Sequence, residues 1–216
     1  MSTITLVRHG QAQTDARDEI GYDSLSDLGR TQSAWLGEHV GITGEHFERV
    51  YCGTLLRHLQ TAEEMGFDAP DRDARLNEFA FFTLAQLWDA QGGDAMPVTR
   101  EDFVHYMPAL LAAWQAGRIE GAPESFADFE GRITDALGDI GAGRGPALVV
   151  TSGGLIGMAV RIVMGLDMRS YARTALTIMN TSVHRLHPIG GGLALTQFNA
   201  VPHLERPDRR HAQTHL

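Results

Sequence analysis

Cysteine is almost absent from this sequence, and its scarcity excludes two kinds of chemistry. The single cysteine, Cys52, cannot form an internal disulfide bond. No cluster of cysteine and histidine residues could supply a thiolate zinc site. We therefore expect a protein of a reducing compartment, the cytoplasm, that holds no structural metal.

Positive charge is also scarce, since 18 Lys and Arg residues face 27 Asp and Glu residues and the formal net charge is -9. Nucleic acids and anionic lipids attract proteins with an excess of Lys and Arg, so we expect neither nucleic acid nor a membrane as a partner. An anion would have to bind at a local site. No window approaches the roughly 18 uninterrupted apolar residues of a membrane span, and no basic segment followed by an apolar stretch indicates a secretion signal.

What the sequence does contain is enough apolar material for one core. With 43% hydrophobic and 21% charged residues, the composition is far from that of disordered chains. Single cores stop growing at roughly 250 to 300 residues, so 216 residues predict one domain over residues 1–216. No internal repeat, low-complexity tract or linker interrupts it.

Short apolar runs predict the strands of this domain. Three of them end at turns that lead to amphipathic helices, as buried parallel strands do: 3–7, 49–52 and 147–151. Two more candidate strands, 182–186 and 193–198, flank a Pro- and Gly-rich turn. The alternation predicts an α/β fold, a three-layer sandwich with a mostly parallel central sheet.

Two segments do not belong to this alternation. Residues from about 84 to 140 are mainly helical in pattern, with Thr99 and Ser125 as helix caps, and we expect them to form a helical cap insertion. A polar tail that begins near Glu205 is expected to be solvated and partly mobile.

The residues that point most directly to chemistry are Arg8, His9 and Gly10, at the carboxyl end of the first strand. In open α/β sheets, ligands bind outside this end of the strands. A histidine ring nitrogen can attack an electrophile while a neighbouring guanidinium holds its oxygens, and phosphorus suits both groups. Taken alone, the tripeptide is equally compatible with a polar loop after a strand.

Further motifs follow in order and together give the chain a family likeness. The chain resembles the histidine phosphatase superfamily, which has the phosphoglycerate-mutase-like fold. The segments that carry this resemblance after Arg8-His9-Gly10 are Leu25 to Gln32, Leu55 to Arg57 with Gln60 to Glu63, Arg75 to Glu78, Val149 to Gly154, and Asn180, Ser182 and Pro202 to Leu204.

The resemblance implies a reaction and a role for each site residue. His9 would attack phosphorus and become a phosphohistidine that water hydrolyses, while Arg8 and Arg57 hold the equatorial oxygens. Glu78 would protonate the leaving oxygen. No metal or other cofactor is implied, because arginines and helix N-termini offset the phosphate charge. The expected activity is hydrolysis of a small phosphomonoester.

One departure from the family bears directly on this reaction. The family places a second histidine immediately before the Gly-Gly of the late motif, and here that position is Ser152. The Ser152 hydroxyl and the Gly153 backbone N–H can both donate to a phosphate oxygen, but neither carries positive charge. The resulting activity is expected to be weak unless another histidine compensates, and His184 and His203 are the candidates.

Other departures concern the loops. Ala12 replaces the family's usual Thr or Ser, and Asp15 its frequent Asn, so Asp15 either brings a negative charge near the phosphate or turns away from it. Gly53-Thr54 replaces the usual Ser-Pro. The glycine- and tryptophan-containing pattern that commonly follows the acid is missing after Glu78.

Three alternatives to hydrolysis on His9 are open. The chain could be a catalytically silent phosphate-binding or regulatory module of the same fold, if Ser152 abolishes turnover. It could be a phosphoglycerate mutase, although that activity goes with the full second-histidine site and a longer cap. It could be a serine hydrolase with Ser152 as nucleophile, since Asp167 and then His184 or His203 follow in the usual order, although the first glycine of G-x-S-x-G is absent.

Several of these residues also have plain structural explanations. Arg57 lies on an amphipathic helix, where charged residues are usually solvated. Glu78 could cap a helix or form an ion pair, since a carboxyl group in an aromatic run is only a probabilistic sign of a functional site. The apolar residues that could wall a substrate site, but are more often core, are Phe79, Phe81, Phe82, Leu84 and Trp88. Neither the substrate nor the oligomeric state follows from the sequence.

Overall fold

Strand β1 (Ile4–Arg8) lies inside a six-stranded sheet in the computed structural model, which describes residues 2–97 and 99–215. The strand order is β3-β2-β4-β1-β5-β6. Strands β3 (Asp71–Arg72), β2 (Arg49–Cys52), β4 (Ala147–Thr151) and β1 are parallel, whereas β5 (Val183–Ile189) and β6 (Gly192–Ala200) form an antiparallel hairpin beside β1. The predicted α/β fold with a mostly parallel sheet is confirmed.

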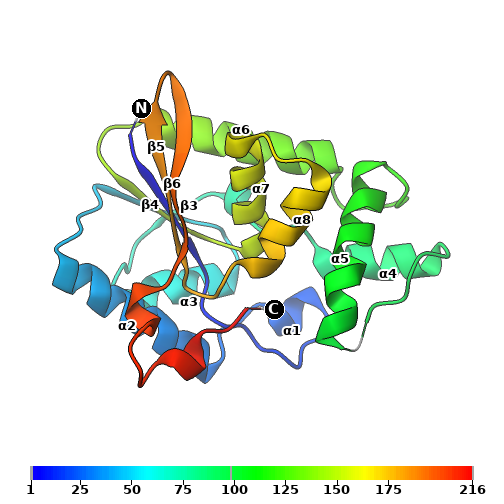
Figure 1. Cartoon of the computed structure of the whole chain (residues 1–216), viewed down its shortest axis with the longest axis horizontal. Helices are drawn as coiled ribbons and strands as arrows, with labels where there is room; N and C mark the ends of the chain where they lie inside the picture. Colours follow the sequence, from blue (N-terminus) through cyan, green and yellow to red (C-terminus); the bar gives the residue numbers. More distant parts are fainter. Residues whose placement is uncertain (1, 98, 216) are drawn as a thin grey trace.

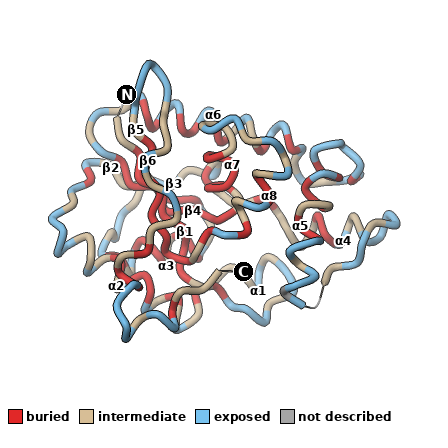
Figure 2. The backbone as a smooth tube through the Cα atoms, viewed as in Figure 1, coloured by how far each residue is buried: buried red, intermediate tan, exposed pale blue. Residues whose placement is uncertain are grey.

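The sheet lies between two helical layers (Figure 1) because its strands are apolar on both faces. On one face, Val7 and Val150 pack in a cluster with residues of α2 (Asp27–Thr43) and α3 (Leu56–Glu64). On the other, Leu6 and Val149 pack with residues of α6 (Phe126–Ala142) and α7 (Gly153–Met164). Figure 2 shows β1, β4 and most of α7 as continuously buried.

The helical segment predicted over about 84–140 forms three helices with two different positions. Helices α4 (Phe81–Ala90) and α5 (Arg100–Gln115) project beyond the sheet, beside α1 (Glu19–Tyr22) and α8 (Met168–Thr177) (Figure 1). Helix α6 instead covers the sheet, with Phe129 and Ile133 buried in the main core. Thr99 and Ser125 cap α5 and α6 as the sequence predicts.

The C-terminal segment is solvated only in part: residues 205–208, 210 and 211 are exposed as predicted, whereas its last described residues are buried or half-buried. Ala212 is fully buried, and the Arg209 guanidinium lies 4.5 Å from the centre of the Trp35 ring on α2. Gln32 of α2 donates to the Ala212 carbonyl. Three short 3₁₀ helices complete the described elements: η1 (Ala74–Leu76), η2 (Pro202–Leu204) and η3 (Arg210–Ala212). Within residues 2–97 and 99–215, no helix is long and apolar enough to cross a membrane.

Two glycines allow the loop after β1 to lie directly on α2. A Cβ atom at Gly10 would be 2.3 Å from the Gly29 carbonyl oxygen, and one at Gly29 would be 2.0 Å from the Gln11 carbonyl oxygen. Both contacts are with backbone, which cannot swing aside. The loop that carries His9 therefore depends on glycine at both positions.

A pair of substitutions on α2 tests this packing. Gly29→Ala forces the loop away from the helix and is expected to lower the free energy of unfolding by about 1–3 kcal/mol, the usual cost of overpacking. The matched control is Gly41→Ala on the same helix, where a Cβ meets nothing within 4 Å. That change is expected to raise stability by about 0.5–1 kcal/mol because alanine favours a helix. Urea unfolding of both variants measures this, and equal effects would contradict the close approach.

Candidate active site

The predicted site residues converge where β1 and β4 end and the helices α3 and α7 begin. His9 follows β1 directly, and its backbone N–H donates to the Thr151 carbonyl at 2.8 Å, which ties it to the end of β4. Its own carbonyl accepts from the Asn180 side-chain amide at 3.2 Å. Segments from four parts of the chain thus meet at this edge of the sheet, as expected for an α/β ligand site.

The His9 ring is held in one orientation and one protonation state. Its Nδ1 is 2.7 Å from the Gly10 carbonyl oxygen, which can only accept, so Nδ1 carries the hydrogen. Burial, reinforced by the charges of Arg57 and Arg8, lowers the pKa of His9 well below its ordinary value. The ring is therefore neutral at pH 7, and Nε2 keeps its lone pair.

Arg8 and Arg57 flank His9 and are themselves nearly buried, at 9% and 5% exposure. The Arg8 guanidinium donates through Nη1 to the Ile178 carbonyl. Arg57 pairs through Nη1 with Asp23 at 3.0 Å and lies 5.2 Å from the centre of the Tyr22 ring. The Nε of each arginine has no hydrogen-bond partner among the described residues. Both arginines line one cavity together with His9, although their Nε atoms are themselves buried.

Glu78 approaches the same point from the loop before α4. Its Oε2 accepts from the Gly154 backbone N–H at 2.7 Å, and its Oε1 accepts from the Phe79 N–H at 3.1 Å. Removal from water raises the pKa of the Glu78 carboxyl above its ordinary value, although these hydrogen bonds and Arg57 act in the opposite direction. A raised pKa is what a proton donor at neutral pH requires.

Ser152 lies beside the site at the N-terminus of α7, but its hydroxyl points into the protein interior and not into the cavity. The side chain is 1% exposed and lies behind the cavity wall, which Gly153 and Gly154 line. Its Oγ is 2.6 Å from Nε2 of His58 and 3.5 Å from Nη2 of Arg57. His58 is therefore a site residue that the sequence analysis missed, and its position directly after Arg57 was the available signal.

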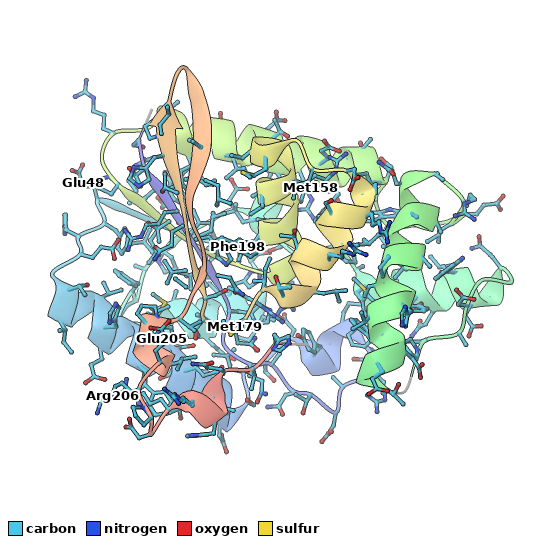
Figure 3. The ribbon with its side chains drawn as sticks, viewed as in Figure 1. Glu48, Met158, Met179, Phe198, Glu205 and Arg206 are labelled. Carbon is cyan, nitrogen blue, oxygen red and sulfur yellow. The ribbon has the colours of Figure 1, made fainter. Side chains whose placement is uncertain are left out.

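The other polar residues singled out from the sequence lie elsewhere. His184 is bonded to Ser182 and packs against Phe198 of β6, whereas His203 is bonded to Thr181. Phe198 is labelled in Figure 3. Burial lowers the pKa of both histidines to about 3. Neither compensates for Ser152 by contact. Asp15 is exposed and turns away from the cavity, although Thr14 and Ala16 line it.

Asp167 also lies away from Ser152, since it caps α8 by accepting from the Ser170 backbone N–H. The triad that a Ser152 hydrolase would need from Asp167 and His184 or His203 is therefore not assembled.

A cavity of about 410 Å³ opens from Arg8, His9, Arg57 and Glu78 towards α4, α5 and α8. Its walls beyond the charged end are mainly apolar and include Phe79, Phe81, Phe82, Met96, Phe103 and Leu176. The remaining cation on its described wall, Arg17, is exposed and donates to the Ala16 carbonyl. Leu84 and Trp88, the other apolar residues considered from the sequence, pack in or against the core.

In the part of the chain that the structure describes, no group of three or more His, Cys, Asp or Glu side chains is placed to hold a metal ion. The positive charge of the site comes from Arg8 and Arg57.

Comparison with known proteins identifies the family. Residues 4–201 match the histidine phosphatase superfamily (branch 1). The chain belongs to this superfamily, and its resemblance to phosphoglycerate-mutase-like phosphatases is thereby confirmed. A comparison with curated protein sequences finds no match.

Solved structures share the fold at low sequence identity. YhfR of Bacillus stearothermophilus is 24% identical, with a TM-score of 0.69 over 95% of this chain and 100% of its own. A phosphoserine phosphatase mutant of Entamoeba histolytica, solved with phosphoserine, is 19% identical, with a TM-score of 0.65 over 94% of this chain and 100% of its own. A mycobacterial glucosyl-3-phosphoglycerate phosphatase is 23% identical, with a TM-score of 0.65 over 92% of this chain and 98% of its own. Family membership supports phosphoryl transfer or hydrolysis as the general activity.

Proposed function

We propose that this protein hydrolyses phosphomonoesters through a phosphohistidine on His9, without a metal ion. The observation that carries the proposal is the state of His9: a neutral ring whose Nδ1 hydrogen is committed to Gly10, between two buried guanidinium groups. A neutral imidazole is a nucleophile, whereas an imidazolium is not. Burial of the ring, reinforced by Arg57 and Arg8, keeps the pKa of His9 low, and the two arginines also attract the phosphoryl group.

The reaction follows from these positions in two displacements. In the first, Nε2 of His9 forms a bond to phosphorus, the bond from phosphorus to the alcohol oxygen breaks, and Glu78 gives its proton to the departing oxygen. In the second, water attacks phosphorus, the Glu78 carboxylate takes the water proton, and the N–P bond breaks. Phosphate leaves, and both residues return to their starting states. Arg8 and Arg57 offset the charge on the equatorial oxygens in both steps.

The cavity indicates what the alcohol part of the substrate is like. Outside the charged end, the walls present aromatic and aliphatic side chains such as Phe81, Phe103 and Leu176. Among the lining residues that the structure describes, the exposed Arg17 is the one further cation that a second anionic group, such as a carboxylate, would meet. We therefore assign to the enzyme phosphomonoesters with a bulky apolar leaving group, and not phosphoserine or phosphoglycerate. A phosphoglycerate mutase activity is disfavoured for the same reason.

The direct test is hydrolysis of phenyl phosphate with a chelator present, followed by acid-quenched labelling with substrate that carries radioactive phosphate. Wild type is expected to release phosphate and to carry an acid-labile, base-stable label that His9→Ala lacks. The activity of His9→Ala is expected to fall by about 10³-fold or more, because the nucleophile is lost. Tight binding of phosphate or vanadate by wild type with no turnover would instead support the silent binding module.

Glu78 gives the reaction a pH dependence of known sign. The acid acts only while protonated, so kcat for an alkyl phosphate is expected to fall as pH rises through the raised pKa of Glu78. Glu78→Gln should remove this limb and lower kcat for alkyl phosphates by about 10²–10⁴-fold, the usual contribution of a general acid. 4-Nitrophenyl phosphate should lose much less, because its leaving group needs little protonation. Equal losses for both substrates would exclude Glu78 as the acid.

The cavity assignment is tested with two neighbouring residues of α5. Phe103→Ala removes part of the apolar wall and is expected to lower kcat/KM for a naphthyl phosphate by roughly tenfold, the scale of lost apolar contacts in a binding pocket. The control is Val104→Ala, which is 44% exposed and absent from the described cavity wall, and which should leave kcat/KM unchanged. A wild-type preference for phosphoserine over naphthyl phosphate would contradict the assignment.

A further inference from the structure

A second histidine lies inside the site, on the side opposite to the cavity. His58 follows Arg57 on α3, and its side chain is completely buried. The centre of its ring is 5.7 Å from that of His9, and the two rings are inclined by 35°. The His58 ring thus packs against the His9 ring, and its Nε2 contacts the hydroxyl of Ser152.

Two positions where this chain departs from its family both contact His58. One is Ser152, which stands where the family has its second histidine. The other is Gly53, where the family usually has serine: a Cβ atom there would be 2.2 Å from Nδ1 of His58. The backbone at Gly53 lies outside the left-handed region, so space for His58 is the constraint at this position. The replacements at 53 and 152 are thus explained together by the presence of one imidazole.

The hydrogen bonds of His58 determine which nitrogen carries its proton. Burial and Arg57 lower the pKa of His58 well below its ordinary value, so the ring is neutral and has one N–H. Nδ1 has no partner among the described residues, and a buried N–H without an acceptor is rarer and costlier than an unpaired lone pair. The proton is therefore on Nε2, which donates to Ser152 Oγ.

This assignment makes Ser152 Oγ an acceptor shared by His58 and Arg57. A serine hydroxyl has two acceptor lone pairs. They accept from Nε2 of His58 and from Nη2 of Arg57, at 2.6 and 3.5 Å. The hydroxyl forms no capping bond to the start of α7. Ser152 therefore links the buried imidazole to the guanidinium at the charged end of the cavity.

We infer that His58 is a positioning residue that acts on Arg57 through Ser152. His58 fixes the Ser152 oxygen, and this oxygen accepts from the Arg57 guanidinium, which holds the phosphoryl group in the proposed reaction. This inference rests on the proposed phosphatase function, but its first consequence is phosphate binding, which can be measured without turnover.

The first experiment compares His58→Ala, His58→Gln and the control Leu56→Ala, an exposed residue on the same helix. Inorganic phosphate is titrated into each variant by calorimetry, and kcat and KM are measured with phenyl phosphate. Loss of a hydrogen bond in a charged network predicts about 10–100-fold weaker phosphate binding and kcat/KM for His58→Ala. Partial recovery is expected in His58→Gln, whose amide can donate to Ser152. Circular dichroism and thermal unfolding verify that each variant folds.

The outcomes separate this inference from the proposed function. Phosphate binding that weakens only in the His58 variants supports the inference even if wild type shows no turnover, in which case the phosphatase proposal alone fails. A folded His58→Ala that binds phosphate and hydrolyses phenyl phosphate as wild type does would overturn the inference.

A second experiment uses Gly53 to displace His58 without removing it. Gly53→Ala is expected to lower kcat/KM by roughly tenfold in the wild-type background and by at least about threefold less in the His58→Ala background, because coupled residues are not additive. The contact of the new Cβ with Asn77, at 2.6 Å, is present in both backgrounds and cancels in the comparison. Equal losses in the two backgrounds would show that His58 has no part in the effect.

Nitrogen-15 NMR of the histidine rings tests the tautomer directly. A proton on Nε2 of His58 is expected. A proton on Nδ1 would overturn the assignment and make Nε2 an acceptor for the Ser152 hydroxyl, which is the arrangement of a serine nucleophile. Hydrolysis of 4-nitrophenyl acetate that survives His9→Ala and is lost in Ser152→Ala would be the corresponding activity.

Discussion

The excess of buried positive charge at the carboxyl ends of β1 and β4 is the constraint on which the site depends. Arg8 and Arg57 are almost fully removed from water, and the described ion pairs give them a single carboxylate partner, Asp23. Burying charge without full pairing costs stability. Burial of the ring lowers the pKa of His9, and the same excess of positive charge lowers it further. The feature that costs stability is therefore also the one on which the proposed reaction depends.

Distant parts of the chain hold this arrangement in place through buried hydrogen bonds. Asn180 donates to the His9 carbonyl and accepts from Thr214, and Gln32 of α2 accepts from the Gln11 backbone N–H and donates to Thr214. The C-terminal segment thus closes a network around the nucleophile loop. Buried polar groups that are mutually satisfied in this way are rigid, because releasing any one of them leaves the others unpaired. In the proposed reaction, a rigid loop serves to hold Nε2 of His9 in one position relative to the phosphoryl group.

The site divides into two regions of opposite character. The end formed by β1, α3 and α7 is polar and charged, and uses backbone groups, arginines and histidines to hold one small anion. The end formed by α4, α5 and α8 is apolar, and presents aromatic side chains from segments outside the sheet. In the proposed function, the charged end holds the phosphoryl group common to all phosphomonoesters, and the apolar end distinguishes between their alcohols. The proposal thus assigns chemistry and specificity to different parts of the chain.

Much of the fold could be predicted from the sequence, because local patterns determine it. The apolar runs at β2 and β4 give the strand bounds without error, and Thr99 and Ser125 begin their helices as predicted. Strand β3 was missed because two residues show no periodicity. The structure also brings together Arg8, His9, Arg57 and Glu78, the residues carried over from the family pattern.

The sequence by itself determined the strands, the helix caps and the charged residues that follow the strands, since backbone hydrogen bonding and side-chain periodicity act over a few residues. Only the tertiary structure decided the role of His58. In the sequence it is one polar residue on an amphipathic helix. Its burial depends on the missing side chain of Gly53, and its partner Ser152 is 94 positions away. The burial of the C-terminal segment and the apolar cavity have the same origin, because both arise where distant segments pack together.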